Sequence, residues 1–279
     1  MRHHNTFKLA AATLAIIGAG TVFFNIATDV VMAAETGKIE TVPTSYQVSD
    51  SLASALSKPE QKKENSGEVN YRVSMDELNT GTPTDVDMTM EEAAEVGAGY
   101  LRNIFGLDLK GAYVYLSYYP GTETFPRAFW SADVLFEEAR SPESTRWSYM
   151  IDAVTGELFN AGYGRQLDAN PSLGYDEELA KDCGLYMELA KKKVEECGLM
   201  DGPVDRVEYN CQGYSGNDPT ITMDVIGKRG EIVNMSFSRY DQVFLGLITD
   251  TSLRIAESAL DDLAGEVEVE SVGFGSNGE

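Results

Sequence analysis

The residue types that most often carry out catalysis are scarce in this chain of 279 residues. Its two histidines, His3 and His4, both lie in a short basic stretch at the N-terminus. The rest of the sequence therefore offers no Ser-His-Asp or Cys-His arrangement and no imidazole ligand for a metal ion. The patterns Gly-x-Ser-x-Gly, Ser-x-x-Lys and Gly-Lys-Ser/Thr, which mark nucleophile and phosphate sites, are also missing. We accordingly expect no catalytic residue, no cofactor and no metal site, and we predict that the chain is not an enzyme.

Carboxylates are the remaining side chains that could do chemistry, since the chain has 45 aspartates and glutamates. Asp133 and Asp224 stand out, because they occupy the same place in the similar stretches 131–134 and 222–225. Many glycosidases act through two carboxylates about 5–9.5 Å apart, so a carboxylate-dependent enzyme acting on glycans is an alternative. Solvent-facing strand positions or turn capping explain both aspartates more simply.

The acidic segment Asp85–Thr89 begins like a calcium loop. Such a loop needs glycine at its sixth position and glutamate at its twelfth, but this sequence has Met90 and Val96 there. We interpret the segment instead as an acidic cap for the helix that follows. Thr89 begins that helix with a capping box, because Glu92 stands three residues later.

Apolar residues at helical spacing predict that this helix runs to Phe105 and ends at Gly106. The period then changes to two, which predicts four short antiparallel strands at 112–119, 127–136, 147–153 and 157–161. Pro120-Gly121 and Thr155-Gly156 supply turns between these strands. The elements together predict a helix packed on a small sheet.

Tyrosines form a row on the first of these strands. Tyr113, Tyr115 and Tyr119 should share the strand face opposite Val114 and Leu116. An exposed row would suit contact with a peptide or a glycan. A covered row would pack against a second unit of the chain, because small units gain stability by burying more apolar surface.

A second helix and further strands follow in the same order. Apolar spacing predicts a helix over Tyr175–Cys197. Strands are expected at 206–210, 222–225, 231–238 and 243–248.

The spacing between similar stretches predicts an internal repeat. Gly106-Leu107 and Gly198-Leu199 are 92 residues apart, and Asp133 and Asp224 are 91 residues apart. A near-constant offset is the sequence signature of a repeat. We therefore predict an α+β fold of two repeated units, each a helix packed on a small antiparallel sheet of about four strands.

Two stretches of the first unit carry a family resemblance. Tyr149–Leu158 is similar to a strand ending in Asp-Ala-x-Thr-Gly-Glu, and Phe129–Val134 is similar to the aromatic-led strand before it. With the preceding helix at the matching spacing, the first unit resembles a PepSY domain. The second unit departs from the pattern, because Arg239–Gln242 stands where the family has its Thr-Gly turn.

PepSY-like domains occur in propeptides of secreted thermolysin-type peptidases and in bacterial envelope proteins. The resemblance therefore implies inhibition or regulation of a peptidase near the cell surface. The motif also has a physical basis, since Asp152 and Thr155-Gly156 suit a tight hairpin turn.

The N-terminal segment predicts export. Arg2 and Lys8 precede the uncharged stretch 9–27, and acidic residues follow it, which places the rest of the chain beyond the membrane. The small residues of 31–34 suit cleavage of a signal peptide, whereas a stretch close to the roughly 20 residues that span a bilayer suits a retained membrane anchor. Both alternatives stay open, and both predict an extracytoplasmic location.

The net charge limits which partners the chain can bind, and the cysteine positions limit which disulfide bonds it can form. A net charge of −23 opposes contact with nucleic acid and with anionic lipid. Cys183 and Cys197 fall on one predicted helix about 21 Å apart, too far for a disulfide. A bond from either of them to Cys211, or three free thiols, remains open.

These observations divide the chain into a signal peptide or membrane anchor (1–34), a flexible spacer (35–86), a PepSY-like unit (87–167), a divergent PepSY-like unit (173–250) and an acidic tail (251–279). We expect an exported, non-enzymatic binding or regulatory module that restrains a secreted peptidase or another envelope protein. Membrane contact is expected only through 9–27, if that segment is retained. An extracytoplasmic sensor part of a single-pass regulator is a second hypothesis, beside the glycan-acting enzyme.

Overall fold

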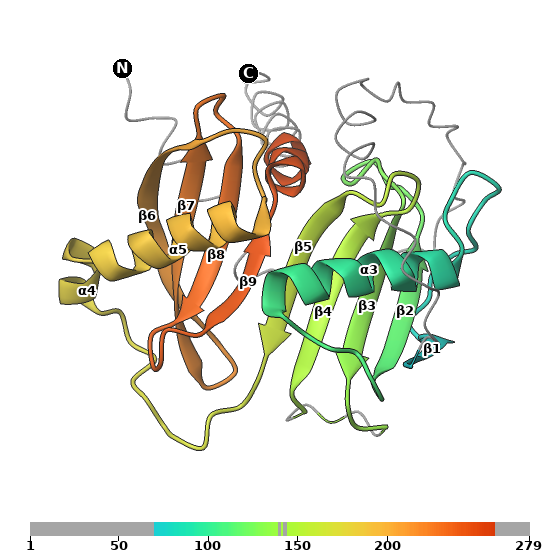
Figure 1. Cartoon of the computed structure of the whole chain (residues 1–279), viewed down its shortest axis with the longest axis horizontal. Coiled ribbons are helices and arrows are strands. Elements are labelled where there is room, and N and C mark those ends of the chain that lie inside the picture. The colour runs from blue at the N-terminus through green and yellow to red at the C-terminus, as the bar shows by residue number, and fades with distance from the viewer. Residues whose placement is uncertain (1–69, 139–140, 142–143, 260–279) are drawn as a thin grey trace, which may run out of the picture.

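The computed structural model describes residues 70–138, 141 and 144–259. One mixed sheet of nine strands has the order β1-β2-β3-β4-β5-β9-β8-β7-β6, and α3 and α5 lie in line across one face of it (Figure 1). The helices are α3 (Met90–Phe105), α4 (Glu177–Lys181) and α5 (Gly184–Cys197). The strands are β1 (Arg72–Met75), β2 (Tyr113–Tyr119), β3 (Phe129–Leu135), β4 (Arg146–Asp152), β5 (Leu158–Gly164), β6 (Val204–Ser215), β7 (Asp218–Gly227), β8 (Ile232–Ser238) and β9 (Phe244–Ile248). Residues 250–259 form a further helical segment.

The prediction of two repeated units, each with its own small sheet, is wrong. β5 pairs antiparallel with β9 at Asn160–Gly162, so the strands of both segments belong to one sheet. This pairing satisfies backbone groups that two separate sheets would each leave on an open edge. The joint is close, because a Cβ on Gly246 would lie 2.6 Å from the carbonyl oxygen of Ala161. Periodicity shows which face of a strand is buried, but it does not show which edges meet.

The sheet also contains a strand that periodicity misses. β1 pairs in parallel with β2 and lies inside the range predicted as a spacer. Three of its four residues are exposed, so no alternation of apolar and polar residues marks it. The predicted signal peptide or anchor, most of the spacer and most of the acidic tail lie outside the described residues. Among the described residues, no helix is long and apolar enough to cross a membrane.

The first helix forms as the sequence predicts. The Thr89 hydroxyl accepts from the Glu92 amide at 3.2 Å, and the Glu92 carboxylate accepts from the Thr89 amide at 2.9 Å. This capping box satisfies two amides that would otherwise lack partners. The helix ends at Gly106 with a φ of 66°, the left-handed conformation typical of a C-terminal cap.

The second predicted helix, Tyr175–Cys197, is broken into α4 and α5. The break lies at Asp182 and Cys183, and Cys183 caps α5 without a side-chain hydrogen bond. Asp182 ends α4 outside the helical region, with a φ of −130° and a ψ of 78°. Apolar spacing continues through the break, which is why the sequence indicated a single helix.

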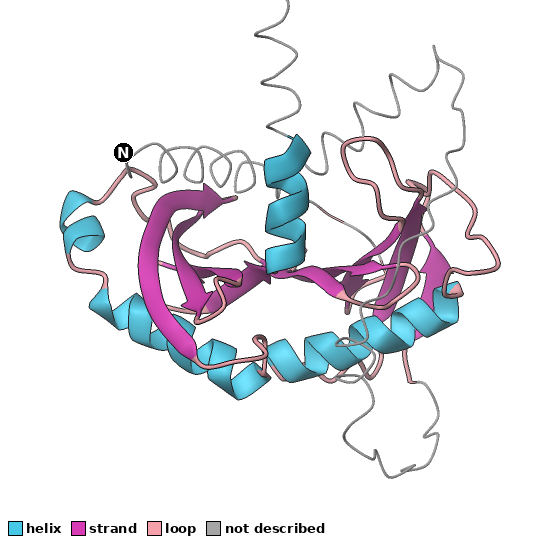
Figure 2. Cartoon of the chain, turned by 90° about the horizontal axis from the view of Figure 1, so that it is seen from above, coloured by secondary structure: helices cyan, strands magenta, loops and turns pink. Residues whose placement is uncertain are grey.

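Small residues let α3 approach the sheet closely. Its buried face consists of Ala93, Ala94, Gly97, Ala98, Leu101 and Ile104. A Cβ on Gly97 would lie 1.9 Å from the Tyr149 ring, so only glycine leaves room for that tyrosine. The Tyr149 hydroxyl donates to the Ala93 carbonyl at 3.2 Å, which satisfies a polar group in the core. The helices α3 and α5 thus both pack on one face of the sheet, and neither lies on the other face (Figure 2).

Candidate functional site on the concave face

The sheet curls away from the helix layer at both ends, so the face opposite α3 and α5 is concave (Figure 2). The helical segment 250–259 stands on this face near the middle of the sheet (Figure 2). Val114, Leu116, Met223 and Val225 belong to the core on the helix side, so strand alternation sends their neighbours to the concave face. The concave face therefore carries Tyr113, Tyr115, Ser117, Tyr119, Ser131, Asp133, Ser148, Asn160, Thr222, Asp224, Asn234 and Ser236.

The three tyrosines share the strand face opposite Val114 and Leu116, as the sequence predicts, and the structure shows that this face is the concave one. Tyr113 and Tyr115 stack with ring centroids 6.5 Å apart, and Tyr119 stacks on Phe129 at 4.9 Å. All three tyrosines are partly exposed. The alternative that the row packs against a second unit is wrong, because the later strands extend the same sheet and do not cover this face. The row therefore offers flat apolar surface beside hydroxyl groups.

Asp133 and Asp224 share the concave face but do not form a pair. Asp133 lies on β3 and Asp224 on β7, which are five strand positions apart in the sheet order. At about 4.8 Å per strand, this separation is about 24 Å along the sheet. The spacing lies far beyond that of a catalytic carboxylate pair. These two residues therefore do not make the carboxylate site of a glycan-acting enzyme.

Asp224 has the more unusual surroundings of the two. Its side chain is buried, and its oxygens accept one hydrogen bond each from the amides of Asn234 and Asn210, both at 2.7 Å. Burial raises the pKa of this carboxyl above its ordinary value, and the two amide hydrogen bonds oppose that rise. The neighbouring Cys211 thiol has a pKa raised to about 11, chiefly by burial, so it stays protonated at neutral pH.

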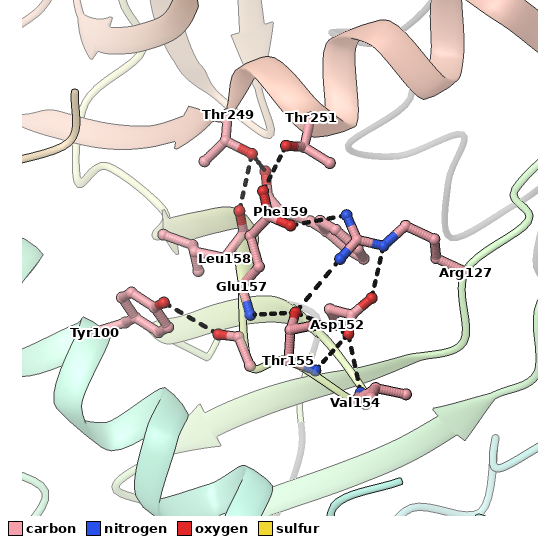
Figure 3. A network of polar contacts seen from close by, with 11 residues as sticks. Tyr100, Arg127, Asp152, Val154, Thr155, Glu157, Leu158, Phe159, Thr249 and Thr251 are labelled. Atoms are coloured by element: carbon pink, nitrogen blue, oxygen red, sulfur yellow. Dashed lines mark hydrogen bonds and ion pairs between the residues drawn. The ribbon is translucent and has the colours of Figure 1, made fainter. Parts of the chain in front are cut away.

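The residues of the PepSY-like motif form a connected polar network (Figure 3). Asp152 accepts from the amides of Val154 and Thr155 at 2.9 and 2.6 Å, which closes the predicted turn. Arg127 donates to Asp152 at 2.7 Å and to Glu157 at 2.8 Å. The carboxylates of Asp152 and Glu157 are thus engaged in ion pairs with Arg127, and Asp152 also accepts from the turn amides. The network positions strands and offers no free group for chemistry.

The same network also fixes the two helical elements nearest to it. The Tyr100 hydroxyl of α3 donates to the Gly156 carbonyl at 3.0 Å. The Thr251 hydroxyl donates to Glu157 at 2.5 Å, and the Thr249 hydroxyl donates to the Leu158 carbonyl at 2.8 Å (Figure 3). Residues 250–259 are therefore anchored at the β4–β5 turn, which sets where this segment stands on the concave face.

The other sequence candidates have local roles. Asp87 accepts from the Thr84 amide at 2.7 Å and from the Tyr118 hydroxyl at 2.9 Å, so the acidic segment organises the chain before α3. Cys183, Cys197 and Cys211 are all free thiols in the structure. Among the described residues, no group of three or more histidine, cysteine or acidic side chains is placed to hold a metal ion.

Comparison with known proteins gives little further guidance. No protein-family model and no curated protein matches the chain. One solved structure, the C-terminal domain of YpeB from Bacillus megaterium, is similar at 12% identity and a TM-score of 0.35. The similarity covers 60% of this chain and 65% of that domain, less than two thirds of its length. A likeness at this level carries no argument about function.

Proposed function

We propose that this chain is an exported, non-enzymatic module that binds a protein partner on the concave face of its sheet. The observation that carries the proposal is the partly exposed tyrosine row, Tyr113, Tyr115 and Tyr119, on the face opposite the helices. Aromatic rings with hydroxyl groups are enriched where proteins bind one another. Neither of the two helices packed on the sheet covers this face.

The expected location and partner follow from the sequence. The charge pattern around 9–27 supports an extracytoplasmic position, either secreted or anchored. The PepSY-like motif supports an envelope protein as the partner, with a secreted peptidase as the first to test. The arginine network around Asp152 supports a structural role for that motif, since its carboxylates are engaged within the fold.

Site-directed photo-crosslinking tests the proposal. A benzophenone amino acid replaces Tyr115 on the concave face in one variant and Leu185 on α5 in the control. Leu185 is 53% exposed and lies on the helix layer, so it reports on contacts away from the proposed surface. We expect a discrete adduct with an envelope protein from position 115 and none from position 185. Adducts from position 185 alone, or turnover of a glycan or peptide by the purified chain, would contradict the proposal.

Mass spectrometry of the N-terminus after expression in a secreting bacterial host tests the location. A mature start at Ala34 or Glu35 supports a freely exported module. An intact Met1 in the membrane fraction supports the anchored alternative. Recovery of the intact chain in the cytoplasm would contradict export altogether.

A further inference from the structure

Three aspartates of the described chain are almost completely buried, and one of them differs from the others. Asp152 and Asp218 are 0% and 1% exposed, and each accepts from an arginine, at 2.7 and 2.9 Å. Asp224 is 8% exposed and its partners are two neutral amides. A buried carboxylate is costly unless a cation balances its charge. Asp224 is thus a buried carboxyl that has no ion-pair partner among the described residues.

A second polar atom beside Asp224 also lacks a partner. Asn210 reaches Asp224 from a bulge in β6 between Tyr209 and Cys211. Its amide nitrogen is used for Asp224, while its Oδ1 is buried without a hydrogen-bond donor among the described residues. Each Asp224 oxygen accepts one hydrogen bond, from Asn210 or from Asn234, and keeps capacity for another. The location therefore has surplus acceptors and needs a donor.

The unused hydrogen-bond acceptors of Asp224 and Asn210 indicate which kind of group would bind there. A donor that is positively charged and accepts no hydrogen bonds would satisfy both Asp224 and Asn210. A metal ion fits poorly, because the described residues place no group of three or more histidine, cysteine or acidic side chains here. A lysine ammonium is compact and sits on a slender stem, whereas a guanidinium needs both carboxylate oxygens in one plane. The small exposed fraction of Asp224 favours the slender group.

Charge near the site favours the same class of partner. Glu208 lies opposite Asp224 in the strand register and is exposed, with Arg206 donating to it at 2.6 Å. The chain as a whole carries a net charge of −23, which draws basic segments toward it. We propose that Asp224 and Asn210 receive one lysine ammonium of a basic protein partner bound to the concave face. This inference rests on the proposed function and names the chemistry of the partner.

Fluorescence anisotropy with a labelled hexalysine peptide at physiological salt tests the inference. Asp224→Asn removes the charge, and we expect it to weaken binding at least about tenfold, as for a truncated buried charge pair. Asp133→Asn is the matched control, because it removes the same charge from the same face about 24 Å away. We expect that control to bind within about twofold of the natural chain, because a charge that lies about 24 Å away is screened at physiological salt. Equal weakening by both variants, or no binding to the natural chain, would overturn the inference.

Two further measurements keep the test decisive. Asn210→Ala removes the unpartnered oxygen together with the amide that donates to Asp224, and it keeps the carboxylate. It replaces Asp224→Asn if thermal unfolding shows that Asp224→Asn does not fold. We expect it to weaken hexalysine binding about threefold or more. A hexa-arginine peptide should be less sensitive to Asp224→Asn, and equal sensitivity would overturn the preference for lysine. Loss of these effects with intact crosslinking at position 115 would refute this inference alone.

Discussion

Two hairpin turns of this molecule have the same backbone and different side chains. Residues 152–157 join β4 to β5, and residues 238–243 join β8 to β9. In both turns the first amide donates to the carbonyl of the sixth residue, at 2.9 and 2.8 Å. In both the fifth amide donates to the first carbonyl, at 3.0 Å. The fifth residue has a positive φ in each case, 72° at Gly156 and 65° at Gln242.

The two turns use different side chains to accept from the turn amides and to bind an arginine. In the first turn the single residue Asp152 both accepts from turn amides and binds Arg127. In the second turn the Ser238 hydroxyl accepts from the Tyr240 amide at 3.1 Å and donates to Asp218 at 2.5 Å. Asp218, from the neighbouring strand β7, then binds Arg165. Both turns therefore contain a side-chain acceptor for turn amides and an arginine-bound carboxylate. Asp152 provides both in the first turn, whereas Ser238 and Asp218 provide one each in the second.

The largest effect should come from breaking the first turn at its shared carboxylate. Asp152→Ala leaves Arg127 without its closest partner and removes the acceptor of two turn amides. We expect a loss of about 3–5 kcal/mol in the free energy of unfolding, as for a broken buried ion pair. Urea denaturation measures the change. A loss below about 1 kcal/mol would show that the buried network is not what holds this turn.

The second turn should be less sensitive at its own carboxylate. Arg165 donates to Asp241 at 2.7 Å, but the Asp241 side chain is 35% exposed and Asp218 remains as a second partner. Asp241→Asn should therefore cost about 1 kcal/mol or less at neutral pH. Urea denaturation beside Asp152→Ala measures the difference. Equal losses in the two variants would contradict the smaller contribution expected of the more exposed Asp241 carboxylate.

The pH dependence of the Asp241 effect sharpens the same comparison. Hydrogen bonds from Arg165 hold the pKa of Asp241 below its ordinary value of 3.8. A lowered folded-state pKa means that the contribution is present above the ordinary value and is lost as pH falls through the folded-state value. The stability difference between Asp241→Asn and the natural chain should thus shrink below about pH 3.8. Denaturation series at several acidic pH values measure it, and a constant difference would refute the assignment.

The sequence predicted the first turn but not its likeness to the second. Asp152 and Thr155-Gly156 are ordinary turn residues, and the structure uses them as such. Arg239–Gln242 lacks glycine, and the carboxylate that serves this turn is Asp218, which lies on another strand. Local residue types therefore predicted the turn at 152–157 but gave no sign of the turn at 238–243. The capping box and the tyrosine face were predictable for the same reason, since each depends on neighbours in the chain.

Features that depend on distant residues were not predictable in this way. The β5–β9 joint depends on Gly162 and Gly246 meeting across the sheet, and nothing near either glycine in the sequence indicates the other. The surroundings of Asp224 depend on a bulge that brings Asn210 to it. The sequence singled out Asp224 by its position alone. Its burial without a cation became visible only with the strands in register.

Replacing the glycine at position 156 by alanine should lower the stability of the fold. Gly156→Ala places a side chain on a residue with a φ of 72°, where a Cβ costs about 1–2 kcal/mol. Gly106→Ala, at a φ of 66° in the cap of α3, has no atom within 4 Å of the new Cβ and is the matched control for backbone strain alone. At Gly156 the new Cβ would also lie 3.4 Å from Val96. Thermal unfolding should therefore show a loss at position 156 that is equal to or larger than that at position 106.

The smallest expected change in stability comes from introducing glycine into the second turn, at Gln242. Gln242 is exposed and adopts the same left-handed conformation as Gly156, so it carries the strain that glycine avoids. Gln242→Gly relieves about 1–2 kcal/mol of strain but adds about 0.5–1 kcal/mol of entropy to the unfolded chain. We expect a net gain of about 0.5 kcal/mol in urea denaturation. Gln242→Ala keeps the Cβ and should be neutral, so a gain in both variants would mean that the side chain, and not the backbone, is the source. A loss on Gln242→Gly would mean that the two turns differ in backbone strain after all, because the shared positive φ would then cost the second turn nothing.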